Sequence, residues 1–187
     1  MQWTIPGTTL QIDKQGADKT EEMFRSMFLA GGMVLGQVAQ ITGLEPYTVQ
    51  NWVKRGFLPA PVNRRYSLSQ LCRVIQINLL KNALSLETVC DLLRFINGKL
   101  DESADDIIDD ATLYFLFVRL ASRARELDSP QLRSAALADA LSGYVEPVPG
   151  AGERVEKALQ IMLTAWIAGL MRQEAEQMLT NTINASK

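Results

Sequence analysis

The ten residues PYTVQNWVKR at positions 46–55 combine amide, hydroxyl and basic side chains with regularly spaced apolar ones. In a helix each residue advances about 100° around the axis, so Val49, Trp52 and Val53 share one side. The opposite side holds Tyr47, Gln50, Asn51 and Lys54, with Thr48 and Arg55 at its flank. Asn and Gln amides pair bidentately with adenine in a DNA major groove, and a Lys or Arg cation suits guanine or phosphate. This face, which carries no carboxylate, predicts contact with bases; the alternative is an ordinary solvated helix surface.

Two cations and a phenol, Arg64, Arg65 and Tyr66, follow on a polar loop or short hairpin arm. Contacts of such side chains with DNA phosphates supply affinity and fix the register of a protein on the duplex. Two other interpretations stay open. The arginines would instead form a surface pair that caps the next helix, and Tyr66 would anchor the core with its hydroxyl at the rim.

Local signals predict two short helices separated by a tight turn. Gly43 suits the left-handed residue that ends a helix over residues 35–42. Pro46 suits the first position of the second helix, which Gly56 ends. A short helix, a turn with glycine and a second helix that starts at proline form the helix-turn-helix layout.

Two longer helices are predicted after the extended, proline-rich residues 57–61. Ser67 and Gln70 match a capping box that opens a helix to about residue 83. Ser85 caps another helix over residues 86–96, which Asn97-Gly98 stops.

Together these segments resemble the MerR family of bacterial transcription regulators. The resemblance lies in VLGQVAQITGLEPYTVQNWVKRGFLPAP, NRRYSLSQLCRVIQINLLK and LSLETVCDLLRFING. It covers residues 33–98, about a third of the chain, and rests on the TGL turn, the GFL after the second helix, the RRY arm and the two helices that follow. The chain also resembles a group from Gram-positive bacteria that joins such a head to a different helical C-terminal domain.

The resemblance implies a winged helix-turn-helix that binds double-stranded DNA. Thr48, Gln50, Asn51 and Lys54 would lie in the groove, and Arg65 and Tyr66 would hold the flanking phosphates. Two features depart from the family pattern. Gln50 stands where the family usually has arginine, and the wing between Pro61 and Arg64 is shorter than usual.

The remainder of the chain is expected to form an arm before this module and a helical domain after it. Residues 1–32 are predicted to be an N-terminal arm, irregular over residues 1–19 and helical over residues 21–29, and residues 33–100 the DNA-binding domain. Residues 101–187 are predicted to form a helical bundle that makes a homodimer, because a single head reads little DNA. The expected class is all-α.

Three helices are predicted in this C-terminal part. Ser103 and Asp106 match a capping box for a helix to about residue 127, Ser129-Pro130 start one that ends at Gly143, and the last covers residues 153–179. The last helix is apolar around much of its circumference, so it is either central in a bundle or shared with a partner. Its methionines and Trp166 are assigned to core packing, with a ligand pocket as the alternative.

Charge and composition separate the two parts. Residues 33–100 hold eight basic and three acidic residues, and residues 101–187 hold eight basic and fourteen acidic ones, a net +5 beside a net −6. A basic module binds a polyanion even in a chain of net charge −2. The aspartates at 105, 106, 109 and 110 are assigned to compensation of a helix dipole, with a divalent cation as the alternative.

Cysteine and histidine content argues against metal and catalytic chemistry. Cys72 and Cys90 lie in apolar stretches and are predicted to be buried, reduced thiols, and the chain has no histidine. No cofactor, metal site or membrane association is expected, and no signal peptide is visible, so the expected location is the cytoplasm. An unidentified small-molecule effector stays open as a partner.

Three classes of function are therefore weighed. A sequence-specific DNA-binding regulator is favoured. The alternative is an architectural or protein-interaction module, excisionase-like, with modest sequence preference. An enzyme is the third class, and neither a phosphate-binding glycine loop nor a nucleophile–base pair is found for it.

Overall fold

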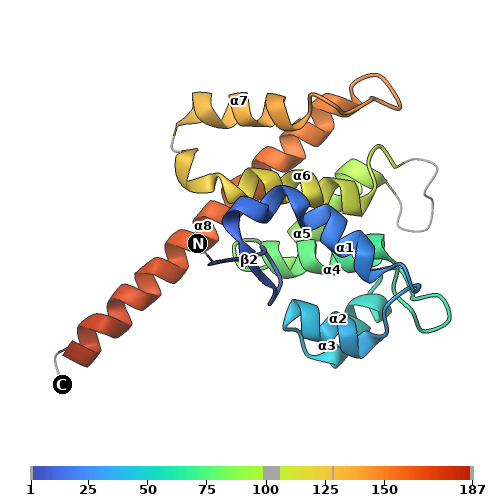
Figure 1. Cartoon of the computed structure of the whole chain (residues 1–187), viewed down its shortest axis with the longest axis horizontal. Coiled ribbons are helices and arrows are strands. Elements are labelled where there is room, and N and C mark those ends of the chain that lie inside the picture. The colour runs from blue at the N-terminus through green and yellow to red at the C-terminus, as the bar shows by residue number, and fades with distance from the viewer. Residues whose placement is uncertain (1, 99–105, 128, 186–187) are drawn as a thin grey trace.

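The computed structural model describes residues 2–98, 106–127 and 129–185 of the 187-residue chain, and this part is mainly helical (Figure 1). The α-helices are α1 (Thr20–Met27), α2 (Leu35–Thr42), α3 (Pro46–Lys54), α4 (Leu68–Leu80), α5 (Leu86–Asn97), α6 (Asp110–Ser122), α7 (Pro130–Ala140) and α8 (Ala151–Ala185). The short elements are strands β1 (Gln2–Thr4) and β2 (Gln11–Asp13) and the 3-10 helices η1 (Lys14–Lys19) and η3 (Ala124–Glu126). The predicted all-α class is confirmed.

Local capping residues set the helix ends near α2 to α5. Gly43 ends α2 with φ 67°, and Pro46 is the first residue of α3. Ser67 and Gln70 form the predicted capping box of α4, with the Gln70 amide donating to Ser67 Oγ over 3.2 Å. Ser85 caps α5 by accepting from the Thr88 amide over 3.1 Å. These boundaries follow from the sequence because each cap is satisfied within four residues.

Helix α6 lies at the centre of the molecule, between α4, α7 and α8. Its sequence is apolar on nearly every side, and Leu113, Tyr114 and Phe117 have no exposed surface. A helix of that kind must be surrounded by other elements. One hydrophobic core consequently continues from α1 through α8.

The prediction that residues 1–19 are irregular is wrong. Strands β1 and β2 pair antiparallel, with Trp3 opposite Ile12, and η1 follows. The turn between them packs on α4: Gly7 has φ 76°, and a Cβ there would lie 2.8 Å from the Ile75 side chain. Asn78 donates to the carbonyls of Gly7 and Thr42 over 3.0 and 2.9 Å. The hairpin therefore depends on contacts with α2 and α4 that no local pattern reveals.

The predicted start of the helix after residue 100 is also corrected. Ser103 lies outside the described residues, but residues 106–109 are not helical and α6 begins at Asp110. Asp109 caps it by accepting from the amides of Ala111 and Thr112 over 2.9 and 3.3 Å. The helix ends at Ser122, with η3 covering the remainder of the predicted span.

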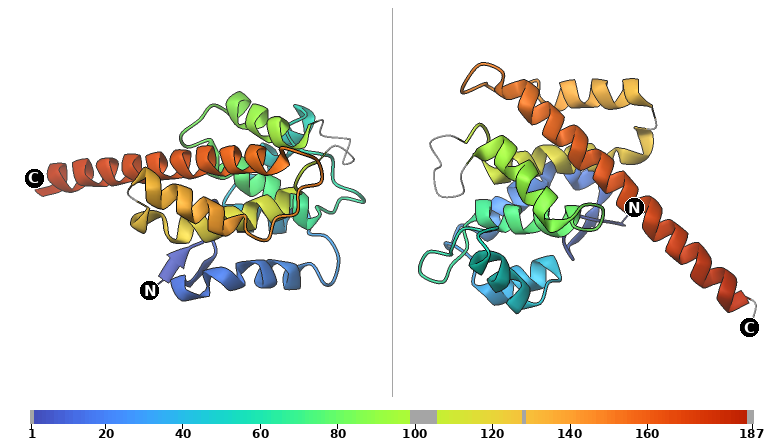
Figure 2. Two further views of the ribbon diagram at one scale, coloured as in Figure 1. Left: turned by 90° about the horizontal axis from the view of Figure 1, so that it is seen from above. Right: turned by 180° about the vertical axis from the view of Figure 1, so that it is seen from behind.

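Helices α7 and α8 begin within two residues of their predicted starts at residues 130 and 153. Helix α7 ends at Ala140, before the predicted Gly143, and α8 continues beyond its predicted end at residue 179 to Ala185. Figure 2 shows that its first part lies across the outside of the other helices and that its last part extends beyond them. No helix within the described ranges is both long and apolar enough to cross a membrane.

Tyr114 offers a test of this core, since its hydroxyl donates to the Pro6 carbonyl over 2.9 Å. Burial raises the pKa of this phenol well above 10.0. The protonated phenol therefore contributes fully to the free energy of unfolding below pH 10. That contribution is lost as pH rises further, because the phenol of the unfolded chain ionises first. We expect Tyr114→Phe to lower the free energy of unfolding by about 1–2 kcal/mol at neutral pH, because it orphans a buried carbonyl. We also expect a weaker loss of stability above pH 10 than in the wild type. Urea unfolding from pH 7 to 11 measures both, and Tyr47→Phe, at an exposed position, is the control at neutral pH.

Candidate nucleic-acid interface

The polar face of α3 is exposed, as its spacing predicts. Val49 and Trp52 are buried against the body, whereas Tyr47, Gln50, Asn51 and Lys54 are exposed and Thr48 is half-buried. Trp52 is also covered by the Lys81 ammonium, 5.7 Å from its ring centre. Core packing therefore orients α3 so that amides and a cation point outward.

Residues 62–65 form the hairpin arm that follows. Val62 bridges Arg65, and the Arg65 amide donates to the Val62 carbonyl over 2.9 Å. The two residues at the tip, Asn63 and Arg64, have φ values of 50° and 60°. Positive φ at both central residues is the geometry of a type I′ turn, in which the second residue is usually glycine. Arginine at this position is strained, because a residue with a Cβ disfavours positive φ.

A groove of about 480 Å³ separates α3 from this hairpin. Gln50 and Lys54 line it from α3, and Arg64 lines it from the hairpin tip. Its apolar lining consists of Leu35, Val53, Pro61 and Tyr66. None of the described residues places a carboxylate in the groove lining. Neither Lys54 nor Arg64 forms an ion pair with a described residue. Two unneutralised cations and an amide thus face one concave surface.

Two other predicted arginines lie outside this groove. Arg55 pairs with Glu87 of α5 over 3.0 Å and stacks 4.5 Å from the centre of the Phe57 ring. Arg65 donates to the Gly32 carbonyl over 2.7 Å and lines a separate pocket with Ser67 and Gln70. Both side chains are exposed. The contact of Arg55 joins the end of α3 to the body, and the contact of Arg65 joins the hairpin to it.

Tyr66 requires a correction, because the structure places it in the core. It is 3% exposed, and its backbone pairs with Met33 through hydrogen bonds of 2.9 and 2.7 Å. Burial raises the pKa of its phenol. The open alternative, a core anchor, therefore describes Tyr66 better than a phosphate contact, and the residue supports the groove from below.

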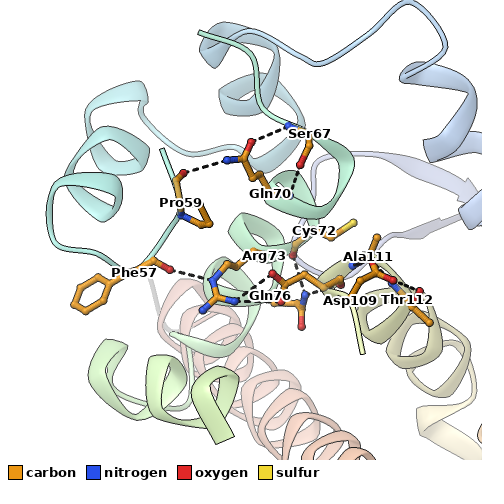
Figure 3. A network of polar contacts seen from close by, with 11 residues as sticks. Phe57, Pro59, Ser67, Gln70, Cys72, Arg73, Gln76, Asp109, Ala111 and Thr112 are labelled. Atoms are coloured by element: carbon orange, nitrogen blue, oxygen red, sulfur yellow. Dashed lines mark hydrogen bonds and ion pairs between the residues drawn. The ribbon is translucent and has the colours of Figure 1, made fainter. Parts of the chain in front are cut away.

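A buried polar network, which the sequence does not reveal, holds the segment that leaves α3 (Figure 3). Arg73 of α4, 5% exposed, donates from Nε to the Phe57 carbonyl over 3.1 Å and from Nη1 to both Asp110 oxygens over 3.1 and 3.3 Å. Gln70 donates to the Pro59 and Ala60 carbonyls over 3.3 and 3.0 Å. The exit of α3 is therefore tied to α4 and to the first residue of α6.

Asp110 serves this network rather than a shared acidic face. Burial raises the pKa of its carboxyl, and the neighbouring Arg73 guanidinium opposes that shift. Because residues 106–109 are not helical, the aspartates of this segment do not lie on one side of a helix. Asp109 caps α6, as a residue at the positive end of a helix dipole should, and Asp105 lies outside the described residues. The described residues contain no cluster suited to a metal ion.

The strained turn leads to a prediction about Arg64. We expect Arg64→Gly to raise the free energy of unfolding by about 1 kcal/mol, because glycine adopts positive φ without steric cost. Arg64→Ala keeps the strain and should leave stability within about 0.5 kcal/mol of the wild type. Thermal or urea unfolding of the pair separates strain from charge. Equal stabilities of the two variants would contradict the strained geometry.

Comparison with known proteins adds no named activity. Residues 32–117 match a family described as "Domain of unknown function (DUF1836)". This stretch includes α2 to α5 and most of α6, so it contains both Arg73 and Asp110. The chain is 22% identical over 107 residues to "Uncharacterized protein YkrK" of Bacillus subtilis (strain 168), an alignment that covers 55% of this chain and 46% of the relative. No solved structure matches the chain.

Proposed function

We propose that this protein is a sequence-specific DNA-binding transcription regulator. Helix α3 would enter the major groove, and the hairpin at residues 62–65 would contact the adjacent backbone, as in a winged helix-turn-helix. The observation that supports this most strongly is the groove shared by Gln50, Lys54 and Arg64, in which no described carboxylate opposes a phosphate.

The roles of the side chains follow from their exposure. Gln50 and Asn51 are exposed amides on the outward face of α3 and would read adenine edges. Lys54 and Arg64 flank the groove and would hold phosphates, which positions the helix but carries no sequence information. Tyr66 and the Arg73 network would act from beneath by fixing the angle between α3 and the hairpin.

A single α3 would contact only a few base pairs, so we propose that the protein acts as a homodimer on a pseudo-palindromic site. An unidentified small molecule that alters the dimer would provide regulation.

Selection from randomised duplexes, followed by fluorescence anisotropy with the selected DNA, tests the proposal. DNA from upstream of the protein's own gene is the first natural candidate. We expect the selected site to bind at least about 1,000-fold more tightly than random duplex. Binding should weaken steeply between two salt concentrations, because neutralised phosphates release counterions.

Two outcomes would overturn this assignment. Equal affinity for selected and random duplexes would show an architectural role with little sequence preference. Absence of binding to any duplex at low salt would show that the surface of α3 serves a different partner.

A further inference from the structure

A second pocket, of about 280 Å³, lies where the hairpin after α3 meets the body. Arg65 lines it from the hairpin, whereas the neighbouring Arg64 lines the groove of α3. Ser69 lines the pocket from the start of α4, Asn97 from the end of α5 and Asp110 from the start of α6. The pocket and the groove have no described lining residue in common, so both can be occupied at the same time.

Part of the pocket wall offers hydrogen-bond donors that no described residue accepts. Arg73, which is 5% exposed, uses its Nε and Nη1 in the buried network, and its Nη2 has no described acceptor. Arg65 donates from Nη1 to the Gly32 carbonyl and to no other described residue. The hydroxyl of Ser69 has no partner among the described residues, and the positive end of the α4 dipole lies beside it. Guanidinium and hydroxyl donors of this kind suit a carboxylate.

Another part of the wall offers acceptors. Asn97 is 6% exposed, and its buried Oδ1 has no hydrogen-bond donor among the described residues. A buried acceptor that lacks a donor lowers the stability of the folded chain, so a ligand that brings a donor regains that free energy. The carboxylates of Asp106 and Asp110 line the same pocket. Together these oxygens suit a donor that carries a positive charge.

Charge and size restrict the ligand. Within the described wall, the guanidinium groups of Arg65 and Arg73 balance the carboxylates of Asp106 and Asp110. An anion alone would meet the two carboxylates, and a cation alone would meet the two guanidinium groups. A zwitterion satisfies both parts of the wall without an unpaired charge. The volume lies near the lower limit of about 300 Å³ for ligand pockets, so the ligand is small.

We propose that this pocket binds a free α-amino acid. Its carboxylate accepts hydrogen bonds from Arg65, from Arg73 Nη2 and from the start of α4. Its ammonium group donates to Asn97 Oδ1 and to the two carboxylates of the wall.

This site deepens the proposed function, and its effect on DNA rests on that function. An occupied pocket ties the hairpin to the ends of α5 and α6, and it thereby fixes the hairpin beside α3 before DNA binds. Such preorganisation raises affinity because less freedom is lost on binding. Amino-acid binding itself is measurable without DNA.

Isothermal titration calorimetry of the full chain with each of the common protein amino acids tests the site. We expect at least one to bind with a Kd below about 1 mM. Its N-acetyl derivative lacks the ammonium group and its α-amide lacks the carboxylate, so each should bind at least about 10-fold more weakly. Binding of none of the amino acids would overturn the proposal. Equal affinity for the N-acetyl derivative or for inorganic phosphate would also overturn it, because either would indicate a simple anion site.

Variants locate the bound amino acid. Arg65→Ala and Asn97→Ala are each expected to weaken its binding about 10- to 100-fold, because each removes a hydrogen bond to a charged group. Arg64→Ala changes the next residue of the hairpin, and Asn184→Ala removes an exposed amide of α8, so both should bind the amino acid as the wild type does. Circular dichroism checks that each variant is folded, and Arg65, which is exposed, is the safer of the two test positions. Equal affinity of Arg65→Ala and Arg64→Ala would overturn the assignment to this pocket.

Fluorescence anisotropy with the selected duplex tests the coupling to DNA. At saturation the amino acid should tighten DNA binding at least about 5-fold, and DNA should tighten amino-acid binding by the same factor. Arg65→Ala should abolish this gain. Unchanged DNA affinity would overturn the coupling between pocket and groove. Amino-acid binding by a chain that binds no duplex would overturn the proposed function and support the pocket alone.

Discussion

Replacement of Asp110 with alanine is expected to lower the free energy of unfolding by about 3–5 kcal/mol, because the buried Arg73 guanidinium would lose its carboxylate partner. Arg73 is 5% exposed and contacts both Asp110 oxygens, so little water would compensate the charge. Its remaining partner, the Phe57 carbonyl, neutralises no charge. Urea unfolding measures the effect.

A surface ion pair serves as the matched control. Arg123 and Asp139 lie 3.7 Å apart with both side chains more than half exposed, so Asp139→Ala should change stability by less than about 1 kcal/mol. The double variant Arg73→Met/Asp110→Leu should be more stable than Asp110→Ala, since no unpaired charge stays buried. A loss below about 1 kcal/mol for Asp110→Ala would show that the pair does not hold α4 to α6.

The second large effect concerns the outward amides of α3 and depends on the proposed function. Asn51→Ala and Gln50→Ala are each expected to weaken binding to the selected DNA about 5- to 150-fold, which corresponds to about 1–3 kcal/mol for a bidentate base contact. Binding to random duplex should change little. Both side chains are exposed, so stability should stay within about 0.5 kcal/mol of the wild type.

Two further variants separate base contacts from phosphate contacts. Lys54→Ala should weaken all duplexes alike and reduce the slope of log affinity against log salt by about one. Asn184→Ala removes an exposed amide at the C-terminal end of α8 and should leave DNA binding unchanged. If Asn51→Ala and Gln50→Ala weaken selected and random DNA equally, α3 does not read sequence.

Much of the helical framework was predictable because its signals are local. The capping pairs at Ser67 and Ser85, the left-handed Gly43 and the helix-starting Pro46 each act within a few residues of their own helix. The same locality explains why the outward face of α3 was found, since a single buried stripe of Val49 and Trp52 determines which side faces solvent.

Several features of the candidate site depended on distant partners. Tyr66 is a phenol in a polar run, and only its pairing with Met33 and its burial beneath the groove make it part of the core. Arg55 is the C-cap residue of α3, and Glu87 of α5 holds its guanidinium. The only sequence signal for the buried network was that Arg73 interrupts the apolar run of α4. The carboxylate that pairs with it, Asp110, lies 37 residues away.

By itself the sequence determined the class of fold, most helix ends near α2 to α5, and the polar face of α3. These depend on side-chain periodicity and on caps that each helix satisfies with its neighbours in the chain. Only the tertiary structure decided that residues 2–13 pair as a hairpin, that α6 begins at Asp110, and which cations face the groove. Each of these requires a hydrogen bond, ion pair or close packing with a residue remote in sequence, and folding selects among such partners by burial rather than by local propensity.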